Sequence, residues 1–364
     1  MRRLIANPPN PFVAAHREWL GEPPRAALRV YEETARSILS ENDSPDLSFR
    51  WSVNPYRGCQ HACAYCYARP THEYLGLGAG TDFDSQITVK VNAAVLLERV
   101  LSRPAWSRER IVFSGVTDCY QPLEAVYGLT RACLDVCRRF ETPAGIVTKS
   151  YLIVRDAELL AALNEAAGVR VFLSIAFAKD ASARKIEPGA PPPSRRFEAL
   201  RRLREAGVPT GVMVAPLIPG LNDREVPEIL ERAAEAGART AAMTALRLPG
   251  SVRDVFLSRL REELPLAARA VELRIRGMRR GELSDPRFGE RMKGNGPYWE
   301  AMRQLFLNSA RKAGLDTDVR MAQRPQRTPA GEPAKPQSLA RATMMHQPKG
   351  KRRGADDGQM SLFE

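Results

Sequence analysis

The sequence predicts an α/β fold built on a mostly parallel sheet. Short apolar runs alternate with amphipathic windows at helical spacing from about residue 87 to residue 246, and this alternation is typical of parallel sheets. Several expected helices end in glycine just ahead of the next strand, at Gly168, Gly207 and Gly237, as helix C-termini often do. Right-handed crossovers between such strands can curl the sheet into a full or partial barrel.

The chain ahead of this alternation is expected to be mostly extended, because prolines are frequent in residues 1–48. One short helix is predicted near Ala26–Leu39. A strand, Ser48–Val53, then leads into a cysteine-rich loop. The strands predicted beyond the loop are Ile87–Val91, Arg110–Ser114, Gly145–Lys149, Val169–Phe177, Thr210–Pro216 and Thr240–Leu246. The helices predicted between them lie near Asn92–Leu101, Leu123–Phe140, Arg155–Ala166, Ser194–Glu205 and Arg224–Ala236.

The C-terminal third changes character. From about Leu257 to Lys312 the sequence is helical in pattern and rich in basic residues, and Pro297–Phe306 has the apolar stripe of a helix that packs on the preceding domain. Beyond about residue 320 a polar, proline-punctuated tract predicts disorder. We therefore expect an extension over 1–48, a core over 49–250, a basic helical extension over 251–319 and a disordered tail over 320–364.

Composition limits the class of protein. Hydrophobic residues make up 44% of the chain and charged residues 27%, which is ordinary for a soluble globular protein. No apolar run approaches the roughly 18–20 residues that span a bilayer, and Pro8 interrupts the first apolar stretch. We expect no membrane association and a cytoplasmic location. The formal net charge of +13 favours an anionic partner, with nucleic acid first among the candidates.

Three of the six cysteines, Cys59, Cys63 and Cys66, are spaced C-x3-C-x2-C. Cysteine thiolates are the usual ligands of iron–sulfur clusters. Three on one short loop can hold three irons of a [4Fe–4S] cube and leave the fourth iron open. A structural zinc site would need a fourth ligand, such as His61 or a distant cysteine. Zinc and simple redox or structural thiols stay open as alternatives at this point.

Polar residues follow the predicted strands where parallel strands end together. Thr117 and Asp118 lie in a small glycine-containing turn, and Lys149 ends an otherwise apolar strand, which suits contact with a carboxylate or phosphate. Ser174 lies inside a buried run, so its hydroxyl needs either a backbone partner or a ligand. Arg184 and Glu187 follow the same strand, where an ordinary surface ion pair would look the same.

The motifs around the cysteines resemble those of the radical S-adenosylmethionine (SAM) superfamily. They are Asn54-Pro55-Tyr56-Arg57-Gly58-Cys59, Tyr65 immediately before Cys66, Thr117-Asp118 past the second barrel strand and Thr148-Lys149 past the third. Together they are similar to the spore-photoproduct-lyase branch, over roughly residues 50–250. The resemblance implies a partial (β/α)6 barrel, a [4Fe–4S] cluster chelated by SAM, and reduction of SAM to a 5′-deoxyadenosyl radical that abstracts hydrogen from the substrate.

The resemblance also implies roles for single residues. Cys59, Cys63 and Cys66 would hold the cluster, with Tyr65 beside it. Around SAM it places Thr117 and Asp118 at the amino group, Lys149 at the carboxylate, Ser174 at the ribose, Arg184 and Glu187 at the ribose or carboxylate, and Ile218 against the adenine.

The sequence departs from the lyase pattern at one decisive position. In that lyase a cysteine three residues ahead of the aspartate returns hydrogen to the product radical, and the matching residue here is Gly115. Cys119 follows Asp118 directly, so it could take the catalytic role only in a re-aimed turn. Cys133 and Cys137 are spaced as buried core positions of one helix. The specific lyase reaction is therefore not expected.

The last residues carry a separate pattern. Gln359, Met360, Ser361, Leu362 and Phe363 are similar to the motif that binds the bacterial sliding clamp. An apolar pair on a basic, disordered tail usually docks into a partner's groove, although an inert tail would also fit.

The favoured interpretation is a radical SAM enzyme, supplied with electrons by an external donor, that acts on damaged DNA. The alternatives are a radical SAM enzyme acting on RNA, protein or a small molecule, and a non-enzymatic iron–sulfur protein that binds nucleic acid.

Overall fold

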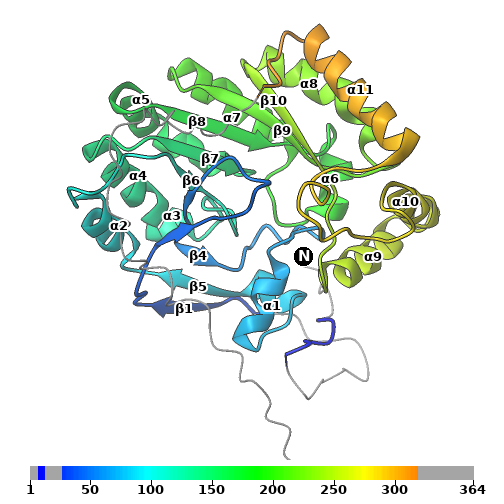
Figure 1. Ribbon diagram of the computed structural model, residues 1–364, viewed down its shortest axis with the longest axis horizontal. Coiled ribbons are helices and arrows are strands. Elements are labelled where there is room, and N and C mark those ends of the chain that lie inside the picture. Colours follow the sequence, from blue (N-terminus) through cyan, green and yellow to red (C-terminus); the bar gives the residue numbers. More distant parts are fainter. Residues whose placement is uncertain (1–6, 13–26, 319–364) are drawn as a thin grey trace, which may run out of the picture. The chain divides into compact units, whose positions relative to one another are not determined.

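The computed structural model describes residues 7–12 and 27–318 (Figure 1). Its main feature is a seven-stranded sheet with the strand order β10-β9-β8-β7-β6-β3-β2. From one edge to the other the strands are β10 (Thr240–Ala245), β9 (Thr210–Leu217), β8 (Val169–Ser174), β7 (Ala144–Thr148), β6 (Ile111–Phe113), β3 (Trp51–Val53) and β2 (Leu39–Glu41).

Six of these strands run in the same direction. Each neighbouring pair from β3 to β10 is parallel, and only β2 pairs antiparallel, with β3 at the edge. The C-terminal ends of the six strands therefore lie along one rim of the sheet. The partial (β/α)6 barrel expected from the sequence is confirmed.

Helices cover the outer side of the sheet (Figure 1). The helices between the barrel strands are α2 (Ala93–Leu101), α3 (Glu124–Tyr127), α4 (Leu129–Arg139), α5 (Ala157–Ala166), α6 (Asp180–Ile186), α7 (Pro193–Glu205) and α8 (Val226–Glu235). The helix predicted over 123–140 is broken into α3 and α4 because Gly128 adopts a left-handed conformation, with φ of 62°. After β10 come α9 (Val252–Glu263), α10 (Pro265–Met278) and α11 (Gly296–Lys312).

A small second sheet corrects two expectations. The helix predicted over Ala26–Leu39 is wrong: the chain forms β1 (Arg29–Glu33), then β2. The predicted strand near Ile87 exists as β5 (Gln86–Lys90), but it joins β1 and β4 (Tyr56–Arg57) rather than the barrel. Val30 and Tyr31 are of types that favour strands, β1 lies at the edge of this sheet, and five residue pairs of β1 and β5 are in register. Pairing with β5 therefore outweighs the helical pattern of the local sequence.

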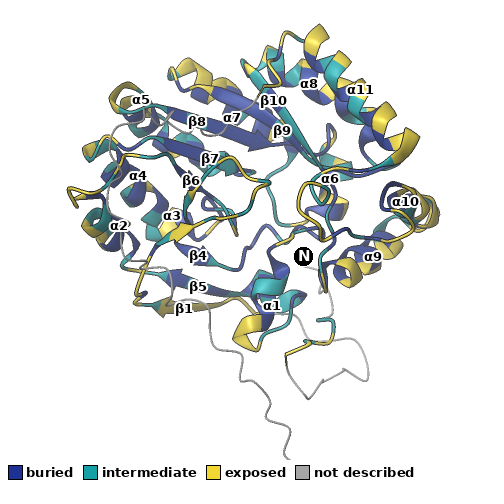
Figure 2. Ribbon diagram, in the orientation of Figure 1, coloured by how far each residue is buried: buried dark blue, intermediate teal, exposed yellow. Residues whose placement is uncertain are grey.

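The two largest apolar clusters lie in the interior, and Figure 2 shows strands β6–β9 as mostly buried and the outer helix faces as exposed. The larger cluster joins strands β6–β10 to helices α2, α4, α5, α7, α8 and α11. The other joins the cysteine loop to α6, α9 and α10. Among residues 7–12 and 27–318, none of the helices combines the length and the apolar character that a membrane crossing requires. The tail expected to be disordered, with the clamp-like motif at 359–363, lies outside the described residues.

Candidate active site at the cysteine loop

The three spaced cysteines lie on the loop that follows β3 and β4. All three are free thiols; Cys59 and Cys63 are buried and Cys66 is half-buried. Burial is the main cause that raises the pKa of each, to about 12 for Cys63. Thiols in this setting stay protonated until a bound metal displaces the proton.

The loop fits a cluster better than a single ion. Within the described part of the chain, no three His, Cys, Asp or Glu side chains converge as the ligands of one metal ion, whereas the cysteines of an iron–sulfur cube each bind a separate iron. His61, between the first two cysteines, is buried, and Nε2 of its ring meets no hydrogen-bond partner among the described residues. The loop thus places three thiols together with one ring nitrogen, Nε2 of His61, that has no hydrogen-bond partner among the described residues.

Backbone contacts hold the loop against the end of α6. The amide of Ala64 donates to the carbonyl of Ile186 at 2.9 Å, and the amide of Gly189 donates to the carbonyl of His61 at 3.0 Å. A side chain at Gly189 would place its Cβ 2.1 Å from the carbonyl oxygen of Gln60. Only glycine allows the two segments to approach this closely.

A buried arginine braces the other side of the loop. Arg69 is completely buried. Its Nε donates to the carbonyl of Cys63 at 3.0 Å, and its Nη1 donates to the carbonyls of Ala79 and Gly80 at 2.8 and 2.9 Å. Its Nη2 lies 3.0 Å from a carboxylate oxygen of Asp84. The guanidinium uses its fixed fork of donors to join three segments around the cysteines.

Asp118, in the turn after β6, faces the cysteine loop. Its carboxylate accepts hydrogen bonds from the hydroxyl of Thr148 at 2.6 Å and the backbone amide of Lys149 at 2.8 Å. The amide of Tyr120 also donates to it at 2.9 Å, and Nδ1 of His61 lies 3.3 Å away. Burial alone would raise the pKa of Asp118, but His61 and these hydrogen bonds hold it at about 2. The neighbouring Thr117 is fixed by Asn54, whose side-chain amide donates to its hydroxyl and its carbonyl, both at 2.8 Å.

Lys149 and Ser174 come together from adjacent strand ends. The Lys149 ammonium donates to the Ser174 hydroxyl at 2.9 Å, and that hydroxyl donates to the carbonyl of Ala215 at 3.1 Å. The same ammonium lies 5.6 Å from the centre of the Tyr65 ring. Three strand ends and the cysteine loop therefore meet around one lysine.

Glu187 is buried between two partners. The hydroxyl of Tyr65 and the Nη2 of Arg196 both donate to its carboxylate. Burial would raise the pKa of Glu187, but Arg196 and Lys149 lower it below its usual value. Arg196 is completely buried and also donates to the carbonyl of Ser174 at 3.0 Å. An ion pair thus anchors the residue that precedes the third cysteine.

The remaining predicted residues are placed as follows. Ile218 is completely buried in the cluster that contains Cys63 and Tyr65. Arg184 is exposed on α6, and with Glu187 it lines a cavity of about 200 Å³ between α6 and α7. Cys119 is buried within the main core. Burial raises its pKa well above the usual value, so the environment of Cys119 gives no support to the catalytic role predicted for it.

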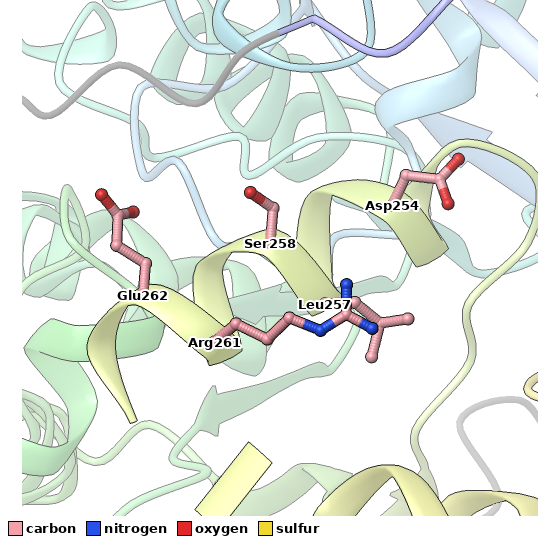
Figure 3. A pocket seen from close by; sticks show the side chains of 5 residues that line it. All are labelled: Asp254, Leu257, Ser258, Arg261 and Glu262. Atoms are coloured by element: carbon pink, nitrogen blue, oxygen red, sulfur yellow. The ribbon is translucent and has the colours of Figure 1, made fainter. Parts of the chain in front are cut away.

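A larger cavity, of about 560 Å³, lies elsewhere (Figure 3). The five residues that line it all belong to α9: Asp254, Leu257, Ser258, Arg261 and Glu262. None of the predicted site residues is among them, so the candidate site rests on the convergence of polar groups and not on cavity size.

Sequence reasoning missed two residues that shape the site. Arg69 and Arg196 look like ordinary members of a basic sequence, and only their complete burial marks them. Arg196 lies on the helix after Glu187, so the arginine that pairs with Glu187 is not the Arg184 next to it in sequence. Only one feature of the sequence could have indicated that Arg196 is buried, and it is weak. Arg196 lies on the inner face of an amphipathic segment together with Phe197 and Leu200.

Comparison with known proteins agrees with this geometry. Residues 53–233 match the radical SAM superfamily. An uncharacterized protein of Mycobacterium tuberculosis is 38% identical over 270 residues, covering 73% of this chain and 78% of the relative. A radical SAM Nalpha-GlyT isomerase of Pseudomonas phage M6 is 24% identical over 193 residues, covering 52% of this chain and 38% of that protein.

The fold also resembles that of spore photoproduct lyase. A structure of a variant of that enzyme, with bound SAM and dinucleoside spore photoproduct, superposes with a TM-score of 0.55. The two chains are 18% identical, and the match covers 80% of this chain and 82% of the other. From the sequence match, the barrel and the cysteine loop, the chain is a member of the radical SAM superfamily, a family of enzymes that use a [4Fe–4S] cluster and S-adenosylmethionine.

Proposed function

We propose that this radical SAM enzyme abstracts hydrogen from a damaged nucleotide in DNA. The observation that carries the proposal is the meeting of three free thiols with the polar strand ends of β6, β7 and β8 on one rim of a strongly basic protein. A cluster and SAM bound at this rim supply a carbon-centred radical. The chain's own residues hold the reactants in place.

Each part of the rim has a distinct task in this proposal. Cys59, Cys63 and Cys66 ligate three irons. The ionised Asp118 carboxylate pairs with the SAM ammonium, and the Lys149 ammonium pairs with the SAM carboxylate. The Asp118 carboxylate accepts a hydrogen bond from the backbone amide of Lys149, and the Lys149 ammonium donates to Ser174. Both charges that would meet the two ends of the amino acid are therefore positioned before SAM binds.

The remaining rim residues shape the space for the nucleoside part of SAM. The Ser174 hydroxyl lies beside Lys149, where it can meet the ribose. The buried side chain of Ile218 packs with the cysteine loop and offers an apolar surface for the adenine. Glu187 and Tyr65 form a buried pair that orients the loop, and Arg184 lines the neighbouring cavity.

Two observations support DNA as the substrate. The net charge of +13 suits a polyanion, and the fold is that of an enzyme solved with dinucleoside spore photoproduct. A damaged base costs less to move out of the stack than an intact one, which favours lesions over normal DNA. Because Gly115 stands where the lyase has its cysteine, no thiol at that position can return hydrogen, and the lyase's own reaction is not expected.

The test combines anaerobic reconstitution with a panel of substrates. The enzyme, dithionite in place of its electron donor, and SAM deuterated at the 5′ position are mixed with ultraviolet-irradiated DNA, undamaged DNA or RNA of the same sequence. The expected result is 5′-deoxyadenosine in all samples, with faster formation and deuterium exchange only in irradiated DNA. Cys63→Ala, which removes a cluster ligand, is the matched control and should form none. Equal rates with all nucleic acids, or stimulation by RNA alone, would contradict the DNA lesion as substrate.

A second partner is proposed from sequence alone. We propose that Gln359–Phe363 binds a sliding clamp and brings the enzyme to DNA under synthesis or repair. A clamp pull-down should retain the wild-type chain and lose the Leu362→Ala/Phe363→Ala variant. Equal retention of both would remove the clamp from the proposal.

A further inference from the structure

A group of arginine and aromatic side chains beyond β10 has no role in holding SAM. Arg247 lies two residues past the end of β10, with its guanidinium 5.7 Å from the centre of the Tyr67 ring. Tyr67 follows Cys66 directly, and its hydroxyl donates to the carbonyl of Gly115 at 3.0 Å. Tyr67 as a whole residue is 49% exposed. Arg247 is therefore tied by contact to the cysteine loop and the β6 turn.

The neighbouring segment, residues 285–293, is firmly attached to the end of β10. The amide of Ala245 donates to the carbonyl of Met292 at 3.2 Å. Arg279, which is buried, donates to the carbonyl of Leu246 at 2.7 Å and to that of Glu290 at 3.1 Å. These contacts hold the segment that carries Phe288, a residue that is 58% exposed and whose ring centre lies 4.3 Å from the Arg291 guanidinium.

Of the two arginines Arg247 and Arg291, only Arg291 is paired with a carboxylate in the part of the chain that the structure describes. Arg291 forms an ion pair with Asp46, from the connection between β2 and β3, and Asp46 is almost completely buried. The Arg247 guanidinium donates to the sulfur of Met292 at 3.3 Å and forms no ion pair with a carboxylate among the described residues. Partial burial, and then the like charge of Arg291, lower the pKa of Arg247. A half-buried guanidinium in this setting is stabilised by an added anion.

We propose that Arg247, Tyr67 and Phe288 form a docking surface for a DNA strand, in which Arg247 binds a backbone phosphate beside the target nucleotide and Phe288 stacks on a neighbouring base. Arginine with exposed aromatic rings is the combination that binds single strands, because phosphates meet the charge and bases meet the rings. The surface adjoins Cys66 through Tyr67, so a strand held there passes the site of hydrogen abstraction. This inference rests on the proposed DNA substrate and names the residues that would recognise it.

The test measures binding of a fluorescently labelled single-stranded oligonucleotide to reconstituted enzyme by anisotropy, over a series of salt concentrations. Arg247→Gln should weaken binding and reduce the slope of log affinity against log salt by about 0.7, because one phosphate contact is lost from a single strand. Arg247→Lys keeps the charge and should retain the slope. Phe288→Leu should weaken binding by about tenfold with no change of slope, because stacking carries no charge.

Arg99→Gln provides the matched control, since Arg99 is an exposed arginine on α2, and its affinity and slope should equal those of the wild type. The docking surface is refuted if the wild type binds the oligonucleotide and Arg247→Gln and Phe288→Leu bind it as tightly with the same slope. If the wild type binds no DNA at all, the DNA substrate itself is refuted, and the docking surface with it. The two failures are thus distinguishable.

Discussion

Replacing Arg196 by methionine should destabilise the protein strongly and loosen the cysteine loop. Arg196 is the buried partner of Glu187, and Glu187 accepts a hydrogen bond from the hydroxyl of Tyr65, the residue before Cys66. Arg196 also donates to the carbonyls of Ser174, at 3.0 Å, and Pro191, at 2.8 Å. Methionine fills much of the volume but supplies none of these donors.

The magnitude follows from the charge that would be left behind. Both side chains of the pair have no exposed surface, and removing one member of a buried ion pair costs about 3–5 kcal/mol of unfolding free energy. Removing both charges costs less, because no uncompensated ion remains. In Arg196→Met/Glu187→Gln the glutamine oxygen still accepts the Tyr65 hydroxyl. We therefore expect the double variant to lose only about 1–3 kcal/mol, from unsatisfied backbone carbonyls.

The assay is anaerobic urea unfolding of the reconstituted protein, followed by circular dichroism, together with the iron content of each variant. Arg196→Met should unfold at lower urea and hold less iron than the wild type, and the double variant should recover part of both. The reasoning is refuted if Arg196→Met costs less than about 1 kcal/mol, or if the double variant is less stable than the single one. If Glu187→Gln alone weakens SAM binding without loss of stability, Glu187 contacts the cofactor rather than anchoring Tyr65.

Three further predictions concern the surroundings of the site. Arg69→Lys cannot reproduce the fork that joins the carbonyls of Cys63, Ala79 and Gly80, so it should lose about 2–3 kcal/mol and part of its iron; wild-type stability and iron content would contradict this. Gly115→Cys brings its Cβ to 3.3 Å from the Cβ of Ser52, a contact that a small shift relieves. Urea unfolding should therefore show a change in unfolding free energy of no more than about 1 kcal/mol. A loss above about 3 kcal/mol would show that no thiol fits there. Burial, and then Arg57, lower the pKa of Lys90 from 10.5 to about 8. Between these two pH values the unfolded chain binds more protons than the folded chain, so the unfolding free energy of the wild type should rise with pH relative to that of Lys90→Met. Parallel profiles of unfolding free energy against pH would refute the shift.

Much of the fold follows from local pattern. The strands β6, β7, β8, β9 and β10 were each predicted within a few residues of their observed ends, because apolar runs buried on both faces alternate with amphipathic helices. The region of β1 and β2 was predicted as a helix, because its mixed polar and apolar residues also suit a helix face. Its extended form depends on pairing: β1 pairs with β5, which lies far from it in the sequence, and β2 pairs with β3, the next strand along the chain.

In the candidate site, too, some residues follow from position along the strands and others depend on the tertiary structure. Asp118, Lys149 and Ser174 were predicted because parallel strands bring their C-terminal ends to one rim, so position along each strand is enough. Cys119 is a different case, because whether the residue after Asp118 faces the rim or the core depends on the turn, and its burial gives no support to the catalytic role predicted for it. Here its backbone amide donates to the Ser114 hydroxyl at 2.9 Å, and its side chain lies in the core.

Spaced thiols and strand-end residues are local features, so they were sufficient to assign the superfamily and its cofactors. Which charged side chains meet, in contrast, depends on how the chain folds. The pairing of Glu187 with Arg196, the bracing of the cysteine loop by Arg69 and the charge left on Arg247 all depend on segments brought together by folding. Electrostatic energy in a protein depends on distance and burial, and neither can be read from the order of residues along the chain.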